Sequence, residues 1–250
     1  MDADSKQLEF GYFGKLPTLG DFVQQVLPQD FVNPWHKWVQ QSMATARESL
    51  GNEFLNYYLN CPAWKFLLNP GVCGQQAVAG LTIPSVDKVG RYFNFTFATI
   101  LPEDVDVCAY ALNNREGFVA LEQLALDILE QDPGRSIIET RTREVTTTFS
   151  MPPATRNQFE ALDDHLMVSQ DQAQPFADQS GTLLSHLLMR QLDDFSIWWY
   201  GMEGQTRSQL MVCRGMPSQE AYDKLLTIGK PPVVAEDEMN YIDQMIAGKD

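Results

Sequence analysis

The sequence has no long hydrophobic run. Its apolar stretches all fall short of the roughly 18 residues that a membrane-spanning helix needs. The first ten residues, MDADSKQLEF, carry neither the basic region nor the apolar region of a secretory signal. From these two absences we expect a cytoplasmic protein that does not insert into a membrane.

Positive charge is scarce. The chain has 18 lysines and arginines against 33 aspartates and glutamates, which gives a formal net charge of −15. Such a surface repels the phosphate backbone of nucleic acids and the headgroups of anionic lipids, so we expect neither as a partner. A basic patch on another protein is the easier electrostatic match.

Cysteine and histidine are too scattered for a metal centre. The cysteines at positions 61, 73, 108 and 213 form no C-x-x-C pair, and we expect them to be buried reduced thiols. None of the three histidines has a second histidine three or four residues away, and His165 has no carboxylate at those positions either. We therefore predict no metal and no cofactor.

Motifs of catalysis are also missing. The sequence has no G-x-S-x-G elbow and no cysteine with a nearby histidine. The stretch GYFGKLPTLGDF from Gly11 is glycine-rich, but its spacing fits neither common phosphate-binding pattern, and Pro17 lacks an N–H donor. These features predict a protein that binds other proteins and is not an enzyme.

Hydrophobic periodicity predicts an α/β fold. Apolar residues three and four apart predict a long helix at 28–51, a further turn or two at 53–59, and helices at 118–129, 182–192 and 219–226. Short apolar or alternating runs predict strands at 8–13, 64–69, 77–83, 93–101, 195–202 and 209–213. Strands followed by helices favour a mixed sheet covered by helices, the 182–192 helix being buried.

The region 141–181 gives weaker signals. The run TREVTTTF predicts a strand, residues 156–165 a short helix, and SQDQAQPFADQSG a polar loop. No internal repeat and no sharp boundary divides the chain, so we predict one domain over 1–250, with an acidic helix at 235–250.

Several polar side chains stand in otherwise apolar surroundings. They are Lys15, Asp21, Ser85, Asp87, Lys88, Arg91, Asp193, Asp194 and Ser196. One interpretation is a polar binding cleft at the strand ends, where α/β sheets place their sites. The other is a loop ion pair between Asp87 and Arg91, which contributes little to stability if it is exposed.

Five motifs occur together and in order: GYFGKLPTLGDFV, an LPxxF start before the 28–51 helix, WKFLLNPGVCG, IPSVDKVGRYFNFT and FSIWWYG. In this order they resemble the TagF/ImpM family of bacterial type VI secretion, over about residues 8–215. The region 140–180 carries little of the resemblance.

The resemblance implies a three-layer α/β/α sandwich. It also implies a cytoplasmic, non-enzymatic, post-translational repressor of type VI secretion that acts by binding a forkhead-associated scaffold protein. On the family-like positions we expect a binding cleft, in which the first five of the following side chains converge on one face beside Trp198. Its residues are Lys15, Asp21, Ser85, Asp87, Arg91, Ser196 and Trp198. We expect Phe13, Gly14, Pro17, Gly20, Phe22, Pro84, Gly90 and Trp199 to shape its loops.

Two other functions remain open at this point. One is a sensor or enzyme that takes a small or phosphate-bearing ligand in the Lys/Asp/Arg cleft, and it predicts a ligand-dependent rise in thermal stability. The other is a structural accessory subunit of the secretion apparatus, which predicts stable co-purification with its components.

Overall fold

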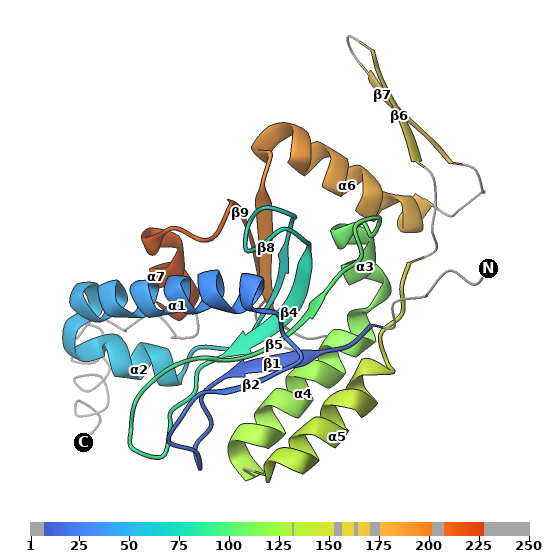
Figure 1. Cartoon of the computed structure of the whole chain (residues 1–250). Helices are drawn as coiled ribbons and strands as arrows, with labels where there is room; N and C mark the ends of the chain where they lie inside the picture. The colour runs from blue at the N-terminus through green and yellow to red at the C-terminus, as the bar shows by residue number, and fades with distance from the viewer. Residues whose placement is uncertain are drawn as a thin grey trace, which may run out of the picture.

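A seven-stranded sheet forms the centre of the molecule (Figure 1). The computed structural model describes residues 8–131, 133–152, 157–162, 165–170, 176–201 and 208–227. The strands of the sheet are β1 (Gly11–Gly14), β2 (Val23–Gln25), β3 (Trp64–Leu68), β4 (Val78–Ile83), β5 (Phe95–Ile100), β8 (Phe195–Tyr200) and β9 (Gln209–Arg214). They lie in the order β2-β1-β5-β4-β3-β8-β9.

The sheet is antiparallel, not mixed as the sequence pattern predicted. Every strand pairing among the described residues is antiparallel, including the long-range pairing of β3 with β8. The physical reason is the length of the connections. Parallel neighbours need a crossover of about a dozen residues or more, whereas short loops return β1 to β2, β3 to β4 and β8 to β9 directly.

One face of the sheet is covered by α1 (Gln29–Leu50), α2 (Phe54–Leu59) and α7 (Gln219–Thr227), with the short helix η1 (Gly51–Glu53) between α1 and α2. The apolar stripe of α1 explains its place: Trp35 is fully buried and its ring lies 4.7 Å from Phe66 and 6.0 Å from Trp198. Gly51 ends the helix as predicted, because its φ of 52° suits glycine and its N–H donates to the Arg47 carbonyl.

The other face is covered by α3 (Val107–Asn113), α4 (Arg115–Gln131) and α5 (Arg135–Thr146). Buried residues of α4, such as Leu121 and Ile128, share a core with Leu81 and Phe97 of the sheet. The sequence prediction placed α4 correctly but contained no helix at α3. Asp106 is the N-cap of α3, since its carboxylate accepts from the Ala109 N–H at 2.8 Å. Aspartate is a preferred N-cap residue, so this position was a signal in the sequence for the start of the helix.

The predicted strand at TREVTTTF is wrong, because residues 142–146 belong to α5 and residues 147 and 148 form a turn after it. Threonine favours strands, but the hydroxyls of Thr142 and Thr146 donate to the carbonyls of Ile138 and Thr142, four residues earlier, at 2.7 and 2.8 Å. Ile138 and Thr142 are buried, so packing outweighs the local preference.

The predicted helix at 156–165 is also wrong. The structure has two antiparallel strands there, β6 (Asn157–Leu162) and β7 (His165–Gln170), which form a separate two-stranded sheet. Only Asp163 and Asp164 separate the two strands, a spacing typical of a tight hairpin.

The last helix of this region, α6 (Phe176–Leu192), begins inside the predicted polar loop and is not buried all round. Leu184, Leu187 and Met189 are exposed on it. The predicted acidic helix at 235–250 lies outside the described residues. In the part of the chain that is described, no helix is both long and apolar enough to cross a membrane.

Candidate functional site

The end of β1 brings two loops together. Gly14 has a φ of 144°, and a Cβ at this position would lie 2.2 Å from the Asn94 carbonyl oxygen. Only glycine therefore allows the chain to pass this close to the start of β5. The loop after β1 then lies against the loop between β4 and β5; we call residues 15–22 and 84–94 the paired loops.

The β4–β5 loop is a small hairpin organised by Asp87. A bridge joins Val86 to Tyr92, and the Asp87 N–H donates to the Arg91 carbonyl at 3.0 Å. The Asp87 carboxylate in turn accepts, through Oδ1, the main-chain N–H groups of Val89 at 3.0 Å and Arg91 at 2.8 Å. Aspartate is a turn residue for this reason.

The second carboxylate oxygen of Asp87 connects the two loops. Oδ2 accepts from Lys15 Nζ at 2.7 Å and from Arg91 Nε at 2.7 Å. The Asp87 side chain is 0% exposed and the Arg91 side chain 57% exposed, so the carboxylate is buried under a guanidinium that faces solvent. Arg91 also donates to the Gly20 carbonyl on the opposite loop.

The pKa of Asp87 reflects this arrangement. Burial acts to raise the pKa, but the hydrogen bonds from Lys15, Val89 and Arg91 outweigh it and hold the pKa well below its ordinary value of 3.8. The carboxylate is therefore ionised throughout the physiological range.

Further hydrogen bonds make the paired loops one rigid unit. The Ser85 hydroxyl donates to the Lys15 carbonyl at 2.8 Å, and the Lys88 N–H donates to the Leu19 carbonyl at 3.2 Å. From α2, the buried Tyr58 hydroxyl donates to the Ser85 carbonyl at 3.0 Å and accepts from the Ser85 N–H at 3.1 Å.

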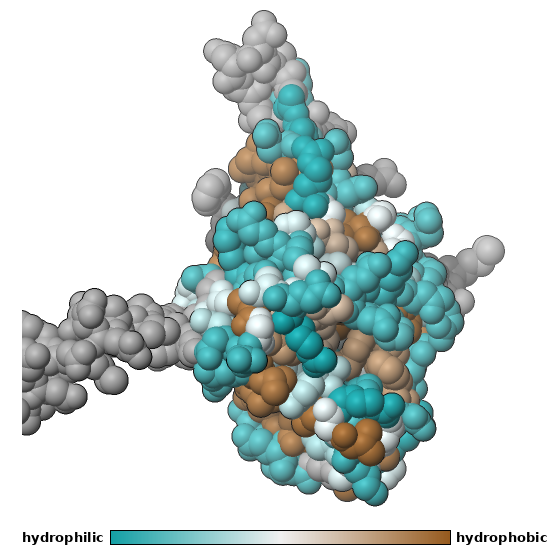
Figure 2. Space-filling view, turned by 90° about the vertical axis from the view of Figure 1, so that its left-hand side faces the viewer, coloured by the Kyte–Doolittle hydropathy of each residue, from teal (hydrophilic) through white to brown (hydrophobic). Residues whose placement is uncertain are grey.

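The outer surface of the paired loops is apolar. Phe22 is 40% exposed, and its ring stacks on Phe13 at 5.4 Å and meets the edge of Phe93 at 4.8 Å. Val89, 68% exposed, and Leu19 extend this surface, with Arg91 beside them. Figure 2 shows apolar residues gathered at the lower end of this face of the molecule, where the paired loops lie in Figure 1.

The structure brings together four of the residues that the sequence assigned to a cleft: Lys15, Ser85, Asp87 and Arg91. Asp21 lies exposed on the same loop, next to Gly20. The residues expected to shape the loops also lie there: Phe13 and Phe22 stack, Gly14 and Gly90 have positive φ, Gly20 supplies its carbonyl, and Pro17 and Pro84 are half-buried.

Ser196 and Trp198 do not belong to this cluster, contrary to expectation. They lie on β8, which is four strand positions from β1 and two from β4, or roughly 19 and 10 Å across the sheet at about 4.8 Å per strand. Trp198 Nε1 donates to the Ser196 hydroxyl at 2.9 Å, which donates to the Gly215 carbonyl at 2.6 Å. Both are core residues beneath α1. Trp199 points to the opposite face and contacts Phe118.

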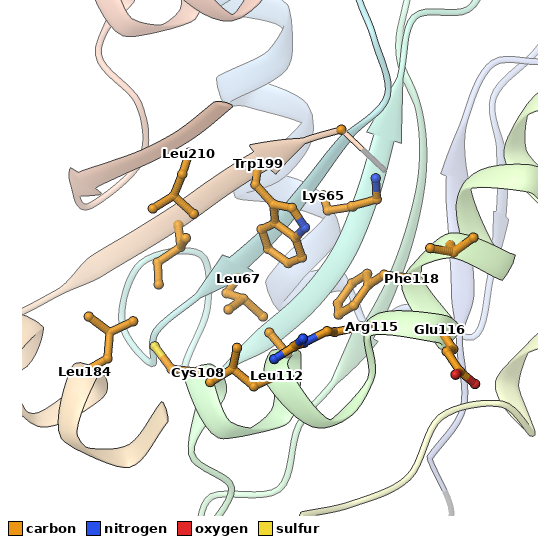
Figure 3. A pocket seen from close by; sticks show the side chains of 14 residues that line it. Lys65, Leu67, Cys108, Leu112, Arg115, Glu116, Phe118, Leu184, Trp199 and Leu210 are labelled. Atoms are coloured by element: carbon orange, nitrogen blue, oxygen red, sulfur yellow. The ribbon is translucent and has the colours of Figure 1, made fainter. Parts of the chain in front are cut away.

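Sequence reasoning missed a second feature, an apolar groove of about 610 Å³ on the α4 face of the sheet. Its floor comes from β3, β8 and β9, and its walls come from α3, α4 and α6 (Figure 3). Residues that line it include Leu67, Leu112, Phe118, Leu184, Trp199 and Leu210. We call it the β3–β8 groove. No single motif marks it, because its residues come from six elements.

The comparisons with known proteins bear on both features. The family model of the TagF N-terminal domain, described as type VI secretion system-associated, matches residues 11–144. The chain belongs to this family. The matched residues contain both paired loops, whereas β8 and β9 lie beyond them.

A solved structure is similar to this TagF-family protein over most of its length. The crystal structure of PA0076 from Pseudomonas aeruginosa PAO1 superposes with a TM-score of 0.71 at 31% sequence identity, covering 90% of this chain and 97% of that one. No curated protein matches the chain.

Proposed function

We propose that this TagF-family protein is a non-enzymatic, post-translational repressor of type VI secretion that binds a forkhead-associated scaffold protein in the cytoplasm. The family is associated with type VI secretion. The observation that carries the proposal further is the surface of the paired loops, where Phe22 and Val89 are exposed on a rigid support.

The physical argument is preorganisation. A surface that is already ordered loses little conformational entropy when a partner binds. Asp87, Ser85 and Tyr58 hold the paired loops in place, so the exposed apolar groups are presented in one arrangement. Aromatic residues and arginine, here Phe22 and Arg91, are the types that dominate binding energy at protein interfaces.

The same geometry disfavours a catalytic or phosphate-binding cleft. Lys15 is buried and its charge is directed at Asp87, so it does not face an incoming anion. The Asp87 carboxylate accepts its hydrogen bonds from Lys15, Val89 and Arg91, which all belong to the two loops themselves. This supports a structural role for the ion cluster and a binding role for the surface above it.

Affinity measurements with the purified forkhead-associated scaffold of the same bacterium test the proposal. Phe22→Ser together with Val89→Ser should weaken binding about tenfold or more, as the loss of a central apolar anchor does. Leu59→Ser is the matched control, because Leu59 is 57% exposed on α2 and lies outside the paired loops. Equal loss in both variants, or no loss in either, would overturn the proposed surface.

The alternatives give different results in parallel measurements. A ligand sensor would show a rise in the unfolding temperature with phosphate-bearing compounds. A structural subunit would co-purify stoichiometrically with the assembled secretion apparatus. The repressor should do neither, and its deletion should raise secretion while the double serine variant fails to restore repression.

A further inference from the structure

The β3–β8 groove is an apolar surface that the described residues leave open. Leu210 on β9 is 69% exposed, and Leu112, Val119 and Leu184 on the three surrounding helices are exposed as well. Soluble proteins seldom leave several large apolar side chains around one concave site without an occupant. The groove's volume of about 610 Å³ is enough for a few large side chains.

Arg115 gives the groove a charge. Figure 3 shows its side chain lying beside Leu112 and Phe118, while the Glu116 carboxylate points away from the groove. Lys65, at the other end, is buried in an ion pair with Glu122. Among the described residues none forms an ion pair with Arg115. An occupant should therefore combine apolar side chains with a carboxylate.

The chain itself contains a segment of this kind. In residues 235–247, Met239, Ile242, Met245 and Ile246 recur at the spacing of one helix face. The same segment carries Glu236, Asp237, Glu238 and Asp243, and no basic residue. Its apolar stripe and its negative charge match the groove and Arg115.

The segment can reach the groove. The end of α7 lies beside the start of β3, because Trp64 Nε1 donates to the Leu225 carbonyl at 3.2 Å. The next residue of β3, Lys65, lines the groove on the opposite face. Residues 228–234 follow α7, and seven extended residues can span up to about 23 Å.

We propose that residues 235–247 bind in the β3–β8 groove of their own chain as an amphipathic helix, with a carboxylate beside Arg115. The groove is then a regulated docking surface: a competing partner must present the same combination of apolar residues and negative charge. This inference does not depend on the paired loops or on the proposed repressor function.

Photo-crosslinking in the full-length protein tests it. Benzoylphenylalanine placed at position 242 should form adducts with groove residues such as Leu112, Val119 and Leu210, identified by mass spectrometry. Arg115→Glu should lower the yield of these adducts about fivefold, the effect of one lost and reversed ion pair. Lys37→Glu, a charge reversal at an exposed site of α1 on the other face of the sheet, should leave the yield unchanged.

An equal mixture of ¹⁵N-labelled and unlabelled chains separates the possible occupants. Adducts within one chain support the proposal, whereas adducts of mixed mass show that a second copy fills the groove and overturn it. Adducts on other surfaces, or none on the groove, also overturn it and leave the groove to an external partner. Arg115→Glu must retain the wild-type unfolding temperature, which we expect because Arg115 is exposed.

Discussion

Two buried lysines illustrate how single residues hold this protein together. Lys15 and Lys65 are each directed at one carboxylate, Asp87 and Glu122 respectively, and each pair joins segments that are distant in sequence. Removing one partner of a buried ion pair destabilises the folded protein strongly, because the other charge is left buried and unpaired. Replacing both partners by apolar residues of similar size often leaves the stability unchanged. The two pairs therefore contribute specificity of arrangement more than net stability.

The pair of Lys65 and Glu122 can be tested by a double-mutant cycle. Lys65→Met leaves the Glu122 carboxylate buried and unpaired between β3 and α4, and should lower the free energy of unfolding by about 3–5 kcal/mol. Adding Glu122→Leu should recover most of that loss. Urea denaturation of the wild type, the two single variants and the double variant measures the free energy of unfolding of each. If the losses in the two single variants simply add up in the double variant, the two side chains are not coupled.

The Asp87 carboxylate predicts a pH dependence. Its pKa in the folded protein lies below the ordinary value of 3.8, so its contribution to stability is fully present above that value and is lost as pH falls through the folded pKa. The stability difference between wild type and Asp87→Asn should be constant from pH 8 to 5 and shrink below pH 3.8.

Denaturation at pH 7, 5 and 2.5 provides the measurement. Asp21→Asn is the matched control, since Asp21 is an exposed carboxylate on the same paired loops, and it should change stability little at any of the three. A difference for Asp87→Asn that is as large at pH 2.5 as at pH 7 would contradict the assignment.

At the scale of the element, the strands and helices with strong periodicity were predictable and those with mixed signals were not. The long α1 and the buried β3, β4 and β5 follow directly from their apolar spacing. The strand preference of threonine misled the prediction at α5, where side-chain bonds to the preceding turn and the burial of Ile138 decide the structure.

The candidate site was predictable only where its residues are close together in the sequence. Asp87 and Arg91 are close in sequence, and their pairing could be foreseen. Lys15 is 72 residues from Asp87, so only the family resemblance indicated that they meet. Trp198 was misplaced because sequence does not say which strands separate two motifs within a sheet. The β3–β8 groove has no local signal at all.

The close approach of β1 to β5 predicts how the elements respond to substitution. Gly14→Ala combines positive φ with a Cβ 2.2 Å from a carbonyl oxygen, and should cost more than about 2 kcal/mol of unfolding free energy. Gly20→Ala meets nothing within 4 Å and should change it by less than about 0.5 kcal/mol. Thermal and urea unfolding distinguish the two, and equal effects would contradict the close approach.

At the scale of the whole molecule, the sheet carries a core on each face, and the β6–β7 hairpin stands apart from both (Figure 1). The hairpin pairs only with itself among the described strands. Replacing residues 154–174 with a short Gly/Ser linker should therefore change the free energy of unfolding by less than about 1 kcal/mol. A large loss in urea denaturation would show that the hairpin supports the sheet.

The long-range pairing of β3 with β8 has a consequence for dividing this protein into pieces. The TagF match ends at residue 144, but β8 covers the edge of β3, and Trp198 completes the packing beneath α1. A fragment of residues 11–144 would keep four of the five motifs and lose FSIWWYG together with two strands of the sheet. The segment that the family model matches is thus shorter than the segment that forms the sheet. If residues 11–144 were fused into another protein, the edge of β3 would be left unpaired and could pair with strands of other chains.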